Sequence, residues 1–94
     1  MEFEWDENKN KLNIIKHGVS FEEAETVFDD ENACVLYDEG HSGIEERFII
    51  IGVDILYREL TVCHCYLNDK NSIRIISARK ATKNEINLYF GGLA

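Results

Sequence analysis

The sequence predicts a single α+β domain: a short N-terminal strand, two N-terminal helices, a four-stranded antiparallel sheet and a C-terminal helix. Helix-capping residues occur within 6–30 and again from 82 onward, and runs rich in Ile, Val, Tyr and Cys fill residues 33–78. The chain has 94 residues, of which 45% are hydrophobic, and it has no proline. That length and composition support one core, and without a linker residues 1–94 form one domain.

The first elements are a short strand and a helix. Apolar and polar residues alternate at 3–5, which predicts a strand, and Asp6 follows as a helix N-cap. Gly18 supplies the C-cap. Helical spacing predicts that Leu12 and Ile15 face inward.

The second helix begins at a capping box made by Ser20 and Glu23. Apolar residues recur at helical spacing through 24–28, so the helix buries one face. We expect it to end near Asp29 and Asp30.

The sheet follows the second helix. Its predicted strands are residues 33–37, 47–53, 57–66 and 72–78. The connections are too short for crossover helices, so consecutive strands should pair antiparallel as a meander.

A C-terminal helix closes the domain. Thr82 and Glu85 form a second capping box, and the helix should end at the glycines 91–92. The apolar stripe that would pack on the sheet consists of Ile86, Tyr89 and Phe90.

Charge divides the chain into two halves of opposite sign. Net charge is −8, yet residues 1–46 hold 14 acids against three lysines, and residues 47–94 hold 4 acids against seven bases. The acidic half is either a solvated surface or a binding surface for a basic protein segment. The cations that could form a local phosphate site are Arg47, Arg58, Arg74, Arg79, Lys80 and Lys83.

The N-terminus has acids where a secretion signal carries bases, and no apolar run approaches membrane-spanning length. We therefore expect a cytoplasmic protein without membrane association. The three cysteines are Cys34, Cys63 and Cys65. A reducing cytosol keeps them as thiols, and their spacing fits no zinc site.

The densest functional pattern is the run 74–80, which places Arg74, Arg79 and Lys80 along and at the end of one strand. Arg74 and Arg79 differ by five positions, so a regular strand points them to opposite faces. They share a site only if the chain turns at Ala78. Alternatively, Arg74 pairs with a strand neighbour such as Glu59, and Arg79 and Lys80 are solvated.

For other residues the sequence allows two roles each. His64 is either a proton donor or acceptor or a buried sheet histidine, on the face opposite Cys63 and Cys65. Glu46 and Arg47 open a strand and supply either a base and a phosphate clamp or a cross-strand ion pair.

Three further side chains have simpler interpretations. Tyr89 fits core packing better than proton donation, because it lies on the apolar stripe. His17 fits the C-terminal end of the first helix, and His41 lies in a loop without a motif.

Several motifs in one order resemble the BrnT toxins of type II toxin–antitoxin systems. They are Phe3–Asp6, Lys16–Ala24, Val27–Asp30, Glu46–Phe48, Ile51–Gly52, Ile73–Ala81, and Glu85 with Tyr89. The resemblance implies a RelE-like fold and an endoribonuclease that arrests translation without metal or cofactor. It also implies a BrnA-type antitoxin as partner, with DNA contacted only through that antitoxin, and a homodimer or a toxin–antitoxin heterotetramer.

The resemblance assigns candidate roles within the site. Arg74 and Arg79 would stabilise the charge that develops on the scissile phosphate of RNA. The candidates for acid and base are His64, Glu46 and Lys80, and those for further substrate contacts are Arg47 and Lys83. The segment 63–69 departs from the family pattern, in which a threonine, an acid and an arginine are common. The alternative function is therefore a non-catalytic antitoxin-binding module acting in operon autorepression.

Overall fold

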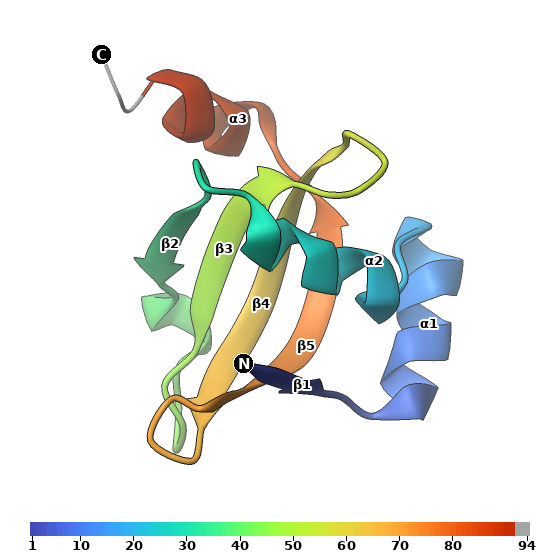
Figure 1. The fold of residues 1–94 in the computed structure, drawn as a ribbon, viewed down its shortest axis with the longest axis vertical. Coiled ribbons are helices and arrows are strands. Elements are labelled where there is room, and N and C mark those ends of the chain that lie inside the picture. The colour runs from blue at the N-terminus through green and yellow to red at the C-terminus, as the bar shows by residue number, and fades with distance from the viewer. Residues whose placement is uncertain (92–94) are drawn as a thin grey trace.

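The computed structural model describes residues 1–91 as three helices around a five-stranded sheet (Figure 1). The helices are α1 (Glu7–His17), α2 (Phe21–Glu25) and α3 (Lys83–Gly91). The strands are β1 (Glu2–Glu4), β2 (Cys34–Tyr37), β3 (Phe48–Val53), β4 (Glu59–Leu67) and β5 (Ser72–Lys80). Short 3₁₀ helices span Thr26–Asp29 and Glu39–His41. The α+β class is confirmed.

The sheet has the order β1-β5-β4-β3-β2. The antiparallel meander from β2 to β5 is confirmed, but the prediction of a four-stranded, wholly antiparallel sheet is wrong. The short N-terminal strand joins the sheet by pairing parallel with β5, with Phe3 opposite Ile73. Phe3 also packs on Phe28, with ring centroids 5.1 Å apart, so an apolar contact holds β1 at the sheet edge.

The caps of α1 are confirmed. The Asp6 carboxylate accepts hydrogen bonds from the first-turn amides, and Gly18 adopts the left-handed conformation, with φ of 70°. The predicted inward face is wrong, because Leu12 and Ile15 are 64% and 82% exposed. The buried side chains of α1 are Asn10 and Asn13.

These two asparagines face inward because α1 packs against backbone whose polar groups need partners. The Asn13 amide donates to the carbonyls of Val19 and Ala78, at 2.8 Å each, and its oxygen accepts from the Ala78 N–H at 3.1 Å. The Asn10 oxygen accepts from the Phe21 N–H at 2.8 Å. Hydrogen bonds therefore join α1 to β5 and to α2.

The capping box of Ser20 and Glu23 is confirmed at the start of α2. The chain tightens into the 3₁₀ helix at Thr26 and leaves it at Asp30, close to the predicted end. Figure 1 shows α2 and this 3₁₀ helix lying across one face of the sheet. The core between them contains Val19, Phe21, Ala24, Val27, Ile50, Leu60, Val62, Ile73, Ile75 and Ala78.

The C-terminal helix α3 lies near the end of the sheet where β3 and β5 finish (Figure 1). Its predicted capping box forms, because Thr82 and Glu85 exchange hydrogen bonds. The predicted apolar stripe is only partly correct: Tyr89 is buried, but Phe90 is 63% exposed. The predicted end at Gly92 lies outside the described residues. None of the described helices is long and apolar enough to cross a membrane.

Candidate active site

A β-bulge in β5 brings Arg74 and Arg79 to the same face of the sheet. Cys63 pairs with Ser77 and His64 pairs with Ile75, so Ile76 has no opposite residue in β4. One extra residue reverses the alternation of side chains beyond it. The expected turn at Ala78 is therefore wrong, since β5 continues to Lys80. The bulge supplies the change of face instead.

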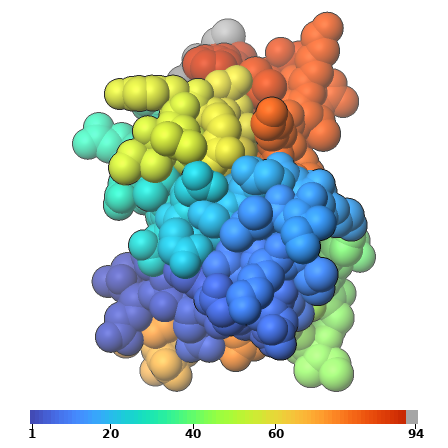
Figure 2. All heavy atoms as spheres, turned by 90° about the vertical axis from the view of Figure 1, so that its right-hand side faces the viewer, coloured from blue at the N-terminus to red at the C-terminus, as the bar shows by residue number. Residues whose placement is uncertain are grey.

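This face carries a cavity of about 120 Å³. Its lining residues are Asp38, His41, Arg47, Ile49, Thr61, Cys63, Ile76, Ser77 and Arg79. They come from β3, β4, β5 and the loop between β2 and β3. Figure 2 shows α1, in blue, toward the viewer, with α2 and the 3₁₀ helix after it, in cyan, on the left flank and the green segment of the β2–β3 loop projecting on the right flank. The cavity lies on the face of the sheet away from α2, because its residues Thr61 and Cys63 alternate along β4 with the core residue Val62.

Arg79 is held in this cavity by Glu85 of α3. The Nη1 and Nη2 atoms of Arg79 donate to the two carboxylate oxygens at 2.7 Å and 3.0 Å, an end-on bidentate pair. Glu85 also accepts from the Thr61 hydroxyl and from the Thr82 N–H. The Arg79 side chain stays 41% exposed. The guanidinium is thus oriented and still accessible to an anion.

Arg47 reaches the same cavity from the end of the β2–β3 loop. The Asp38 N–H donates to the Arg47 carbonyl, and the Ser42 hydroxyl accepts from the Arg47 N–H, so hydrogen bonds close the base of the loop. Its guanidinium lies 3.8 Å from Glu45. The sequence left open a cross-strand ion pair for Glu46 and Arg47, but Arg47 pairs instead with Glu45 of its own loop, at a distance that leaves the guanidinium available to a ligand.

His41 is the functional candidate that sequence reasoning missed. Its Nδ1 lies 3.0 Å and 3.1 Å from the two carboxylate oxygens of Asp38. The Asp38 side chain is 18% exposed and the His41 ring 74% exposed. The one available signal was the Asp-x-x-His spacing, which a single helical turn converts into a contact.

The thiols on this face are protonated groups. Burial raises the pKa of Cys63, and the nearby Asp38 carboxylate raises it further. Burial and then Glu45 raise the pKa of Cys65 in the same way. Neither is disulfide-bonded. Neutral thiols are poor nucleophiles, so Cys63 contributes to the lining of the cavity and not to its chemistry.

The structure does not bring His64 to the cavity. Its ring is fully buried on the opposite face of β4, among Phe28, Phe48 and Tyr66. Nδ1 lies 3.2 Å from the Val62 carbonyl oxygen. Burial lowers the pKa of His64, because the charged ring would lose its hydration. Its position matches the buried sheet histidine that the sequence left open.

The remaining predicted site residues do not line this cavity. Arg74 shares its face but pairs with Glu4 at 3.5 Å and Glu45 at 3.9 Å, so the suggested pairing with Glu59 is wrong. Glu46 lines a separate hollow beside β3 and β4. Lys80 is exposed and lies opposite Leu60, so it follows the other face of β5, and Lys83 is exposed at the start of α3.

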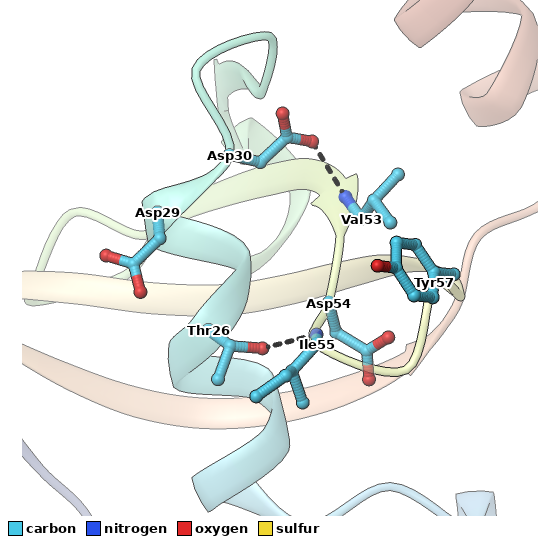
Figure 3. Close-up of a pocket in the computed structure, with 7 residues that line it drawn as sticks. All are labelled: Thr26, Asp29, Asp30, Val53, Asp54, Ile55 and Tyr57. Atoms are coloured by element: carbon cyan, nitrogen blue, oxygen red, sulfur yellow. Dashed lines mark hydrogen bonds between the residues drawn. The ribbon is translucent and has the colours of Figure 1, made fainter.

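A second cavity, of about 340 Å³, lies between the 3₁₀ helix after α2 and the β3–β4 turn (Figure 3). Asp29, Asp30 and Asp54 line it, and none of its described lining residues is a cation. Figure 3 shows the two hydrogen bonds that join its walls, from the Val53 N–H to Asp30 and from the Ile55 N–H to Thr26. Carboxylates repel phosphate, so this cavity does not suit an RNA backbone.

No group of three or more His, Cys, Asp or Glu side chains within residues 1–91 is arranged to hold a metal ion. Two guanidinium groups and a histidine–aspartate pair surround one cavity, which suits binding of an anion together with proton transfer.

The chain is similar in sequence and in fold to known proteins. A family described as "Ribonuclease toxin, BrnT, of type II toxin-antitoxin system" matches residues 5–85. Among solved structures, the chain is similar to the ribonuclease toxin BrnT of Brucella abortus, with a TM-score of 0.68 and 26% sequence identity. That similarity covers 88% of this chain and 99% of the Brucella chain. No curated protein matches the sequence.

Proposed function

Because the chain belongs to the BrnT family of ribonuclease toxins of type II toxin–antitoxin systems, we propose that it is a metal-independent, RelE-like endoribonuclease. Its activity arrests translation by cutting RNA. A cytoplasmic location suits this substrate, and the free thiols suit a reducing compartment. The single observation that carries the proposal is the cavity shared by Arg47 and Arg79.

The proposed reaction is attack of an RNA 2′-hydroxyl on the adjacent phosphorus. The oxygens of the phosphate group gain negative charge as the 2′-oxygen attacks and the 5′-oxygen leaves, so the protein must place fixed positive charge beside them. Arg79 and Arg47 supply that charge from two sides of one cavity, without a metal ion. Glu85 positions Arg79 in advance, which avoids reorganisation during the reaction. Arg74, farther along the same face, is placed for a flanking phosphate.

The test is cleavage of end-labelled RNA by the purified protein in excess chelator, with and without translating ribosomes. We expect products with a 2′,3′-cyclic phosphate and a 5′-hydroxyl. Loss of one preorganised donor typically lowers the rate by about 100- to 1000-fold. We therefore expect the Arg79→Ala variant to cleave RNA more slowly than the wild type by that factor. Lys11→Ala removes an exposed cation on α1, outside the cavity, and is the matched control for lost charge.

Absence of cleavage under both conditions, by a protein that still binds its antitoxin, would refute the enzyme. It would favour the alternative of a non-catalytic antitoxin-binding module in operon autorepression.

The proposed partner is a BrnA-type antitoxin that approaches the acidic flank with a basic, partly apolar segment. The cavity in Figure 3 offers carboxylates there, and its rim carries Ile55, Leu56 and Tyr57, which are 68%, 56% and 87% exposed. Asp29→Lys should weaken antitoxin binding and leave RNA cleavage unchanged. Asp69→Lys changes net charge equally at an exposed position in the turn between β4 and β5, at the opposite end of the sheet from this cavity. Equal weakening by both would refute this placement. A toxin–antitoxin heterotetramer, rather than a toxin homodimer, is the assembly we expect.

A further inference from the structure

We propose that His41 is the general acid of the reaction and that Asp38 is its positioning residue, an inference that rests on the proposed ribonuclease function. The arginines of the cavity supply positive charge but remain protonated and cannot exchange a proton. Of the three histidines, all within the described residues, only His41 lines this cavity. It is therefore the side chain there that is suited to proton transfer near neutral pH.

The contact with Asp38 fixes how the His41 ring can act. Both carboxylate oxygens lie within 3.1 Å of Nδ1, so the hydrogen on Nδ1 is engaged and Nε2 is the nitrogen left for substrate. Asp38 is itself fixed, because its N–H donates to the Arg47 carbonyl and its own carbonyl accepts from the Ser42 hydroxyl. The same backbone contacts that place Arg47 therefore place the proton donor.

The exposure of the two side chains suits these roles. The carboxylate is mostly covered, whereas the imidazole is largely open to solvent at the cavity edge. An aspartate that only paired with an exposed histidine at the surface would contribute little to stability. Beside two guanidinium groups, which supply positive charge, the same pair supplies the proton donor for cleavage of a phosphodiester.

The proposed step forms one bond to phosphorus and breaks another. The 2′-oxygen forms a bond to phosphorus and loses its proton to water, while the bond from phosphorus to the 5′-oxygen breaks. The 5′-oxygen takes the Nε2 proton of the imidazolium and leaves as a hydroxyl. The imidazole, now neutral, regains a proton from solvent for the next turnover. The products are a 2′,3′-cyclic phosphate and a 5′-hydroxyl.

The decisive experiment compares two oligonucleotides that carry one ribonucleotide at a mapped cleavage position. One has the natural 5′-oxygen, and the other has a bridging sulfur there, which leaves without protonation. His41→Ala should lose about 100-fold or more in rate on the oxygen substrate, as expected for loss of a general acid. On the sulfur substrate it should cleave near the wild-type rate. His17→Ala, a histidine at the end of α1, is the matched control and should behave as wild type on both.

The outcomes separate this inference from the proposed function. A wild-type protein that cleaves neither substrate refutes the ribonuclease itself. An active wild type with an unimpaired His41→Ala variant refutes the role of His41 alone. Equal losses on both substrates also refute it, because they place the defect before departure of the leaving group.

Asp38→Asn tests the positioning role. The amide keeps the size of the side chain but loses the charge that holds the imidazolium. We expect kcat to fall while KM is unchanged. A rise in KM with unchanged kcat would show that Asp38 only shapes the loop, and would refute its part in proton transfer.

Discussion

Replacement of Asn13 by alanine tests the unexpected polar interface between α1 and the sheet. The change removes three hydrogen bonds to buried backbone groups of Val19 and Ala78. At about 1 kcal/mol for each net bond the loss is about 3 kcal/mol. The better helix propensity of alanine offsets about 0.5 kcal/mol. Asn13→Ala should therefore lower the free energy of unfolding by about 2.5 kcal/mol, which corresponds to a fall in Tm of roughly 10–20 °C for a domain of this size.

Leu12→Ala is the matched control, one residue away on the same helix. The hydrophobic pattern of the sequence predicts that Leu12 is a core residue, but its side chain is 64% exposed in the structure. Its replacement should change stability by less than about 0.5 kcal/mol. Urea unfolding followed by circular dichroism measures both variants. A larger loss for Leu12→Ala than for Asn13→Ala would refute the reasoning.

Three further variants probe contacts around the sheet. Burial raises the pKa of Glu85, but its hydrogen bonds, above all the one from Arg79, lower that pKa to about 2. The ionised Glu85 carboxylate therefore contributes its full stabilisation of the folded state above about pH 4.5, and this contribution is lost as the pH falls toward 2. Glu85→Gln should flatten that part of a stability–pH curve, and an unchanged slope would contradict it. Tyr89→Phe removes the 2.6 Å bond from the phenol to Asp30 and should cost about 1.5 kcal/mol in urea unfolding, and a stability equal to wild type would contradict this. Gly52→Ala places a Cβ 3.0 Å from Val27 and 3.1 Å from Asp30. It should cost about 1–3 kcal/mol, and a stability equal to wild type would show that the site has room.

Local chemistry made much of the fold predictable. Asp6, Ser20 and Thr82 cap their helices as the sequence indicates, because an N-cap depends on residues within one turn. The meander is predictable for a related reason: short connections leave antiparallel pairing as the available arrangement. The parallel pairing of β1 with β5 depends on contacts across the whole chain, and no local pattern signals it.

The site was less predictable because it depends on departures from regular periodicity. The bulge at Ile76 reverses the alternation in β5 and so aligns Arg79 with Arg74, whereas a regular strand separates them. Nothing in the run of apolar residues marks that position. His41 was missed for a different reason, since its role comes from a loop whose shape is set by tertiary hydrogen bonds. The burial of Asn13 in α1 was unpredictable for a similar reason, because this polar side chain is buried where the neighbouring backbone needs hydrogen-bond partners.

The net charge of −8 and the proposed phosphate-binding cavity are compatible because the acidic cavity and the guanidinium groups lie at different places on the molecule. The acidic cavity lies beside the 3₁₀ helix after α2, and the guanidinium groups lie with the loop and β5 on the other flank. Arg47 and Arg79 are each paired with an acid, so their attraction for RNA is short-ranged and acts on a phosphate that has already entered the cavity. RNA in general is repelled by such a protein. In the proposed function this charge distribution admits a substrate only at the cavity and leaves the acidic flank to a basic partner, so the two ligands need not compete for the same cations.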